Sequence, residues 1–231
     1  MHGIVFDLFH TLVDPEDFRP RQSFRVRDVA EAIDANGRDL IMFWKDTYDE
    51  RTTTPVSGTD LILRYAADND IAVSEAQRAE ITDHLGNYQD DALEQPRPDV
   101  VDAVAGLAER YPLVVLSNCY VEEVVGWPNS PLAPYFAGAA FSYAIGARKP
   151  DRASYLAATA LLGLDPGNAA FIGNGGSKEL QGAKDAGFAV VVHQNQFNIT
   201  NRLVSEEEQQ HRAAQADAQI TSLAELEELL P

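Results

Sequence analysis

Side chains that could carry out a displacement reaction lie at the ends of apolar segments of this chain. Asp7 directly follows the apolar run from Gly3 to Phe6, and Thr11 can turn its hydroxyl toward the same place. A carboxylate after a buried run is expected at the carboxyl end of a parallel strand, because an unpaired buried charge is costly and open α/β sheets hold their sites there. The alternative at this point is that Asp7 only caps a turn.

The later chain favours the functional interpretation of Asp7. Ser117 and Asn118 end a second apolar run, and a third run leads into a glycine-rich loop and Glu179. Lys149 stands just before a predicted helix, where the helix dipole disfavours a cation, so a structural role explains it poorly. An acid, a hydroxyl, an ammonium and a final acidic loop therefore follow one another along the chain.

This order resembles the haloacid dehalogenase-like hydrolase superfamily. The resemblance implies an α/β fold, in which a Rossmann-like doubly wound parallel sheet forms the core and an α-helical cap is inserted. The core would comprise residues 1–14 and 97–231, and the cap residues 15–96. The resemblance also implies that Asp7 is a nucleophile whose ester intermediate is cleaved by water. The other catalytic residues that it implies are Thr11, Ser117, Asn118 and Lys149.

Two positions depart from the pattern of the phosphatases in this superfamily. They carry an Asp two residues after the nucleophile as general acid, and here Phe9 stands in that place and cannot donate a proton. They also carry an Asp metal ligand in the last loop, where this chain has Asn174. The resemblance implies a Mg²⁺ site made of Asp7, the carbonyl of Phe9, Asn174 and Glu179. We expect weak binding, because Asn174 adds no negative charge.

Three functions remain open from the sequence, and a phosphatase is expected ahead of a dehalogenase. The first is a Mg²⁺-assisted phosphatase of a small anionic metabolite, the second a metal-independent 2-haloacid dehalogenase, and the third a degenerate member that binds a ligand or partner. An aromatic residue at Phe9 fits the second in one respect, although that branch has Tyr there. Expected substrate contacts are His10, Gly175 and Arg51. His10 is either a substitute proton donor or a packing residue, and Arg51 either a cap cation or an exposed helix end.

The hydrophobic pattern predicts the elements that hold these residues. Residues 14–96 show helical spacing and predict about four helices, ended by Pro96 and Pro98. Strands and helices then alternate, which implies a parallel sheet covered on both faces. Strands are predicted over 3–6, 113–116, 139–143, 169–172, 188–192 and, at an edge, 218–221. The helices between them are predicted over 100–110, 121–125, 151–162, 178–186 and 223–230. The polar segment 194–216 predicts a solvated loop and helix face.

Composition limits the partners of this chain. Its 231 residues include 36 acidic and 18 basic side chains, which give a net charge of −18. Such a surface repels nucleic acid and anionic membranes, so neither is expected as a partner. We expect a monomer or homodimer. The single cysteine, Cys119, excludes an intramolecular disulfide, favours the cytoplasm and is read as a small buried side chain.

Overall fold

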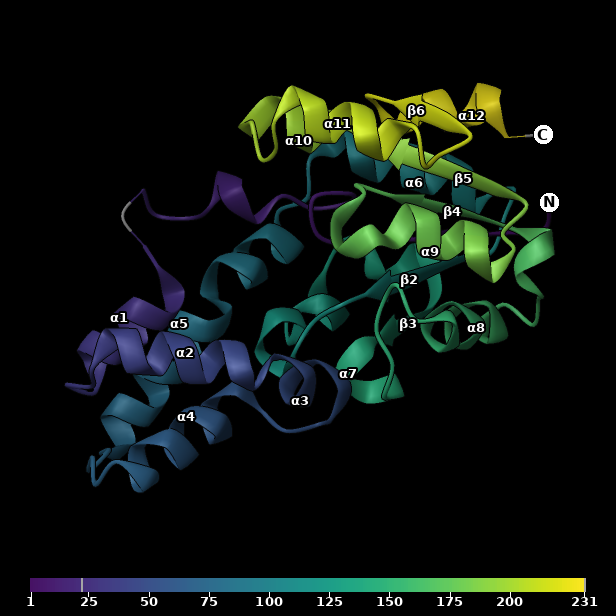
Figure 1. Cartoon of the computed structure of the whole chain (residues 1–231). Helices are drawn as coiled ribbons and strands as arrows, with labels where there is room; N and C mark the ends of the chain where they lie inside the picture. Colours follow the sequence, from purple (N-terminus) through teal and green to yellow (C-terminus); the bar gives the residue numbers. More distant parts are fainter. Residues whose placement is uncertain (22, 231) are drawn as a thin grey trace.

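A six-stranded parallel sheet forms the centre of the structure (Figure 1). The computed structural model describes residues 1–21 and 23–230. The strands are β1 (Gly3–Phe6), β2 (Leu113–Ser117), β3 (Phe136–Phe141), β4 (Ala169–Gly173), β5 (Val190–Gln194) and β6 (Ala218–Ile220). They lie in the order β3-β2-β1-β4-β5-β6, and every neighbouring pair is parallel. The predicted doubly wound α/β fold is thereby confirmed.

The first strand lies in the middle of the sheet and is buried on both faces. Val5 pairs with Val114 of β2 on one side and with Phe171 of β4 on the other. Ile4 and Phe6 belong to one hydrophobic cluster and Val5 to a second one, because successive side chains of a strand point to opposite faces. The carboxyl ends of β1, β2 and β4 consequently meet at one edge of the sheet.

Helices cover both faces of the sheet (Figure 1). They are α6 (Pro98–Ala108), α7 (Ser142–Ile145), α8 (Arg152–Leu161), α9 (Glu179–Ala186), α10 (Gln196–Asn201), α11 (Glu206–Ala213) and α12 (Leu226–Leu229). The helix predicted over 121–125 is a single 3₁₀ turn, Val121–Val124. The strand predicted over 139–143 is wrong at both ends. It begins at Phe136, whose ring packs edge-on against Phe6 and Trp127, and the chain turns into α7 at Ser142.

A second group of helices lies beside the sheet, in the segment predicted as the cap (Figure 1). It comprises α1 (Arg25–Ala32), α2 (Gly37–Asp46), α3 (Tyr48–Thr53), α4 (Gly58–Asp68) and α5 (Glu75–Glu94). The described part of this segment therefore holds five α-helices, one more than the four or so that the sequence predicted. Helix α3 was not predicted as a separate helix, because it is short and polar and its sequence has no apolar stripe. Helices α1, α2, α4 and α5 share a hydrophobic cluster, to which α3 contributes no residue. The domain limits at 14/15 and 96/97 stay a prediction, since Ala92 and Leu93 at the end of α5 pack in the main core.

One short core segment, just after β2, is inserted among the cap helices. Tyr120 belongs to the hydrophobic cluster of the cap, and its hydroxyl donates to the Leu85 carbonyl at 2.8 Å. Glu122 is buried, and its carboxylate accepts the N–H groups of Gly58 and Thr59 at 2.9 and 2.8 Å. These contacts satisfy two N–H groups at the start of α4 that have no partner within the helix. The helix dipole also favours the negative charge of Glu122 at this N-terminus. The segment that leaves the site at Ser117 therefore also holds the cap.

The polar segment 194–216 is only partly solvated, which corrects the prediction. Helix α11 is exposed, but Phe197 and Asn198 of α10 are 0% and 1% exposed. Asn198 is buried because its amide group binds the last-motif loop, as described below. No helix in residues 1–21 and 23–230 combines the length and apolar character that crossing a membrane requires.

Candidate active site

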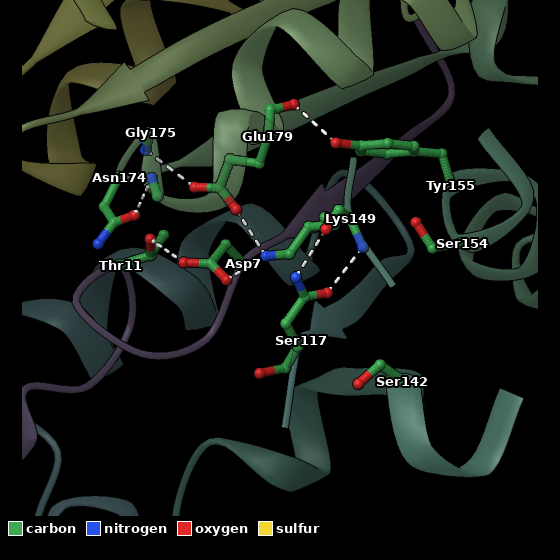
Figure 2. A network of polar contacts seen from close by, with 12 residues as sticks. Asp7, Thr11, Ser117, Ser142, Lys149, Ser154, Tyr155, Asn174, Gly175 and Glu179 are labelled. Carbon is green, nitrogen blue, oxygen red and sulfur yellow. Dashed lines mark hydrogen bonds and ion pairs between the residues drawn. The ribbon is translucent and has the colours of Figure 1, made fainter. Parts of the chain in front are cut away.

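Asp7 lies at the carboxyl end of β1, at the edge where β2 and β4 also end. Its N–H donates to the Ile172 carbonyl at 2.9 Å, which continues the pairing of β1 with β4 beyond Phe6. Asp7 is 6% exposed, and its side chain has two partners. The Thr11 hydroxyl donates to Oδ2 at 2.7 Å, and the Lys149 ammonium donates to Oδ1 (Figure 2). The predicted meeting of Asp7, Thr11 and Lys149 therefore exists in the structure.

Lys149 is a buried cation shared between two carboxylates. It is 2% exposed, and its Nζ lies 2.6 Å from Oε2 of Glu179 in addition to its contact with Asp7 (Figure 2). Burial by itself would lower the pKa of Lys149, but Asp7 and Glu179 together raise it. Asn118 fixes the backbone at this point, because its amide accepts the Lys149 N–H at 2.7 Å and donates to the Lys149 carbonyl at 2.8 Å. Asn118 thus positions the ammonium.

Glu179 is the most deeply buried carboxylate of the site. It is 1% exposed, Oε2 binds Lys149, and Oε1 accepts the Gly175 N–H at 2.9 Å. Burial and the nearby charge of Asp7 raise the pKa of Glu179 to about 7. The Tyr155 hydroxyl donates to the Glu179 backbone carbonyl at 2.8 Å and fixes the start of α9 (Figure 2). The sequence did not single out Tyr155; its only signal was an aromatic residue within the helix after Lys149.

The loop between β4 and α9 needs its glycines to bring Glu179 back to the site. A Cβ on Gly173 would lie 2.5 Å from Oε1 of Glu179, and Gly175 has a φ of +88°. Both positions exclude ordinary side chains, one by space and one by backbone conformation. Asn174 follows β4, and its Oδ1 accepts the Gly176 N–H at 2.8 Å. The loop is thereby held as a tight turn over the end of β4.

Two side chains from the polar C-terminal segment hold this loop from outside. The Asn174 carbonyl accepts hydrogen bonds from Asn198 Nδ2 at 3.0 Å and from Arg212 Nη1 at 3.2 Å. Neither residue was predicted from the sequence, because both stand in a polar stretch that resembles a solvated surface. Asn198 and Arg212 therefore act as positioning residues for Asn174.

The remaining predicted residues lie around this network. Ser117 ends β2 and is 1% exposed. His10, half-buried with a φ of +59°, pairs through Nδ1 with Asp14 Oδ1 at 3.2 Å. Phe9 is half-buried and packs against the main hydrophobic cluster.

Arg51 lies in α3 of the cap and makes no contact with Asp7, Lys149 or Glu179 in the part of the chain that the structure describes. It is buried, so the interpretation of Arg51 as an exposed helix end is wrong.

Comparison with known proteins identifies the family. The model of a haloacid dehalogenase-like hydrolase matches residues 1–187. The chain belongs to this family. It is a hydrolase by that membership, and the recognition made from the order of its motifs is confirmed. No curated protein sequence matches the chain.

Solved structures of haloacid dehalogenase-like enzymes share the fold of this hydrolase. A 2-haloacid dehalogenase from Pseudomonas syringae pv. Tomato is 22% identical with a TM-score of 0.67, and a HAD phosphatase from Thermococcus onnurineus is 19% identical with a TM-score of 0.64. An L-2-haloacid dehalogenase from Xanthobacter autotrophicus is 18% identical with a TM-score of 0.59. Each alignment covers 100% of this chain and 98% of the other. At these identities the similarity establishes the fold, and both activities occur among the relatives.

The oxygens predicted to hold Mg²⁺ in this hydrolase already have protein partners. Both carboxylate oxygens of Asp7 and of Glu179 are engaged, and Oδ1 of Asn174 binds Gly176. Among residues 1–21 and 23–230, no group of three or more His, Cys, Asp and Glu side chains could hold a metal ion. Since a divalent cation favours several charged oxygens, this donor set fits Mg²⁺ poorly. Glu179 in particular lies with Lys149 instead of with a set of metal donors.

We expect the Glu179→Gln variant to lose a pH dependence of stability that the native protein shows. The unfolded carboxyl titrates near 4.5, whereas folded Glu179 keeps its proton to about 7. Between these values the folded state binds more protons, so the stabilisation is present at low pH and is lost as the pH rises toward 7. Relative to Glu179→Gln, the native protein should lose about 3 kcal/mol of unfolding free energy over this range.

Urea unfolding of both proteins at pH 5, 6, 7 and 8 measures this difference. Glu228→Gln, which changes an exposed glutamate of α12, is the matched control and should leave the pH dependence as in the native protein. Parallel pH curves for the native protein and Glu179→Gln would show that Glu179 titrates as it does in the unfolded chain.

Proposed function

We propose that this hydrolase displaces a leaving group from a carbon atom of a small anionic substrate, in the manner of a metal-independent 2-haloacid dehalogenase. The observation that carries the proposal is the charge at the site. Two buried carboxylates share the ammonium of Lys149, and their oxygens, already bound to protein donors, fit poorly the dication that would screen them from a phosphate dianion. Phe9 supports the same choice, because a halide leaves without the proton that an alkoxide requires.

The chemistry follows from the contacts of Asp7. One carboxylate oxygen of Asp7 attacks the carbon, the bond to the halide breaks, and the halide leaves with the electron pair. Lys149 and Thr11 orient the carboxylate for this attack. Water then attacks the carboxyl carbon of the ester and passes a proton to Glu179, whose raised pKa suits a base near neutral pH. The bond between this carbon and the substrate oxygen breaks, the released oxygen takes the proton back from Glu179 to give a 2-hydroxy acid, and Asp7 returns to a carboxylate by losing its own proton to water. Of the relatives, the Xanthobacter dehalogenase has been solved with chloropropionic acid covalently bound.

A substrate panel with and without Mg²⁺ tests the proposal. We expect 2-chloropropionate to be hydrolysed at the same rate with added Mg²⁺ and with a chelator, because no step uses a metal. Alkyl phosphates should be inert. The release of chloride and of inorganic phosphate is measured in parallel on the same enzyme.

The opposite pattern would overturn this choice between the two activities. If aryl or acyl phosphates react and 2-chloropropionate does not, the enzyme is a phosphatase that lacks the general acid at Phe9. Alkyl phosphates should then react about 10²–10⁴-fold more slowly than aryl phosphates, and Phe9→Asp should restore them selectively. If alkyl and aryl phosphates react equally fast, a donor other than residue 9, such as His10, must supply the proton.

A Mg²⁺-assisted phosphatase is the second candidate, and the positions of Asp7 and Asn174 favour it. Asp7 directly follows β1 and Asn174 directly follows the neighbouring strand β4, so both residues lie at the same edge of the sheet. The amide of Asn174 supplies a dipole where a carboxylate would supply a charge, so Mg²⁺ should bind weakly.

We expect Asn174→Asp to bind Mg²⁺ more tightly than the native protein. A carboxylate adds Coulomb attraction for the dication at a position that is 8% exposed, where screening by water is weak. Calorimetric titration of both proteins with MgCl₂ measures the change, with Asn168→Asp, at an exposed position before the start of β4, as the control. Submicromolar affinity in the native protein would contradict the weak site.

A further inference from the structure

Arg51 is a buried cation that forms no ion pair with a carboxylate in residues 1–21 and 23–230. It is 6% exposed, and its guanidinium carbon lies 4.2 Å from the ring centre of Trp44, 4.9 Å from that of Tyr48 and 5.9 Å from that of Tyr120. Nη1 donates to the Trp44 carbonyl, while Nε is buried and has no hydrogen-bond partner among the described residues. The edge of the guanidinium formed by Nε and Nη2 therefore has no hydrogen-bond acceptor among the described residues.

Other arginines of the cap differ from Arg51 in this respect. Arg25 pairs with Glu123 at 2.8 Å, and Arg64 pairs with Glu50 at 2.7 Å. A buried charge normally needs a counter-charge, since the loss of its hydration costs more free energy than a cation over an aromatic ring recovers. Burial accordingly lowers the pKa of Arg51. The aromatic rings orient the guanidinium, and the nearby carboxylate of Glu123, which attracts the charge of Arg51, already pairs with Arg25 at 2.8 Å.

Arg51 lies at the junction between the cap and the active-site edge of the core. Helix α3 lies against α7 (Figure 1). The guanidinium carbon of Arg148, the neighbour of Lys149, lies 5.0 Å from the ring centre of Tyr48, and its Nη2 lies 2.6 Å from Oδ1 of Asp49. Tyr120, the third ring around Arg51, stands two residues after Asn118. The segments that carry Lys149 and Asn118 thus border the place where Arg51 is held.

We propose that Arg51 is the binding site for a carboxylate group of the substrate, a subsite that rests on the proposed function. A planar carboxylate matches the Nε and Nη2 edge with two parallel hydrogen bonds, and it supplies the counter-charge that the protein lacks. The net charge of −18 makes such a local cation necessary for an anionic substrate. The rings of Trp44, Tyr48 and Tyr120 keep the guanidinium in one orientation before the substrate arrives.

Trp44 provides a direct reporter of this subsite. The chain has two tryptophans, Trp44 and Trp127, so Trp127→Phe leaves Trp44 as the single emitter. Titration with sodium propionate should change the emission of Trp44 and reach saturation, and neutral propionamide should not. Because propionate has no leaving group, this binding needs no turnover. In the same background, Arg51→Met should weaken propionate binding at least about tenfold, the loss expected for hydrogen bonds to a charged group.

Arg64→Met is the matched control, since Arg64 is an exposed cap arginine whose partner is Glu50, and it should bind propionate as the parent does. The proposal is overturned if propionate leaves Trp44 unchanged, or if Arg51→Met binds propionate with the parent affinity. Should Arg51→Met fail to fold, the Trp44 titration and the Arg51→Lys variant decide, because lysine keeps the charge and loses the two-bond edge. If propionate binding depends on Arg51 but 2-chloropropionate is not hydrolysed, the carboxylate subsite is supported and the proposed function is wrong. If 2-chloropropionate is hydrolysed and Arg51→Met has an unchanged KM, the proposed function is supported and the subsite is wrong.

Discussion

Asp7→Asn should lower turnover on any substrate of this hydrolase by about 10⁴-fold or more, the scale of losses when an enzyme nucleophile is removed. The amide cannot form the ester through a carboxylate oxygen. Single-turnover measurements on the substrate identified by the panel determine the loss. A rate near that of the native enzyme would show that the mechanism of the family does not operate in this chain.

The same substitution should leave thermal stability nearly unchanged. An amide at position 7 keeps the shape of the side chain and an acceptor for the Thr11 hydroxyl, and Lys149 retains its contact with Glu179 at 2.6 Å. Asp14→Asn is the matched control, since Asp14 is a second buried carboxylate of the same turn but binds His10 and Asn201. It should lose far less activity than Asp7→Asn.

Lys149→Met should cause the largest loss of stability among the variants considered, about 3–5 kcal/mol of unfolding free energy. Methionine fills most of the space of the lysine stem but leaves the carboxylates of Asp7 and Glu179 facing each other without a cation. The loss should be smaller at pH 5.5 than at pH 8. At the lower pH Glu179 holds its proton, and only one negative charge remains to be buried.

Urea unfolding at the two pH values measures this effect. Lys184→Met is the control, because Lys184 pairs with Asp217 at 2.9 Å on a partly exposed surface, where removing a pair costs about 1 kcal/mol or less. Equal losses for Lys149→Met and Lys184→Met would mean that the buried ion pairs contribute no more than surface ones. Lys149→Met should also be inactive, because the carboxylate of Asp7 loses the ammonium that orients it.

The sequence by itself determined the parallel sheet and which strand ends carry the residues of the site. Apolar runs such as Gly3–Phe6 and Leu113–Ser117 predict buried strands locally, and alternation with helices leaves few topologies for a parallel sheet. Polar residues placed after such runs then meet at the carboxyl edge. For this reason Asp7, Thr11, Ser117 and Lys149 could be identified before any coordinates, and so could the departures at Phe9 and Asn174.

The tertiary structure decided what each of these side chains touches. Lys149 binds Asp7, which is 142 positions away in the chain, and the amide of Asn118 is used to hold the Lys149 backbone. Such pairings depend on long-range packing and leave no local hydrophobic pattern. Polar segments mislead for the same reason: a hydrophilic stretch looks solvated whether its amides face water or, as with Asn198, a backbone carbonyl. The burial of Arg51 among three rings from α2, α3 and the segment after β2 likewise exists only once the cap and the core are packed together.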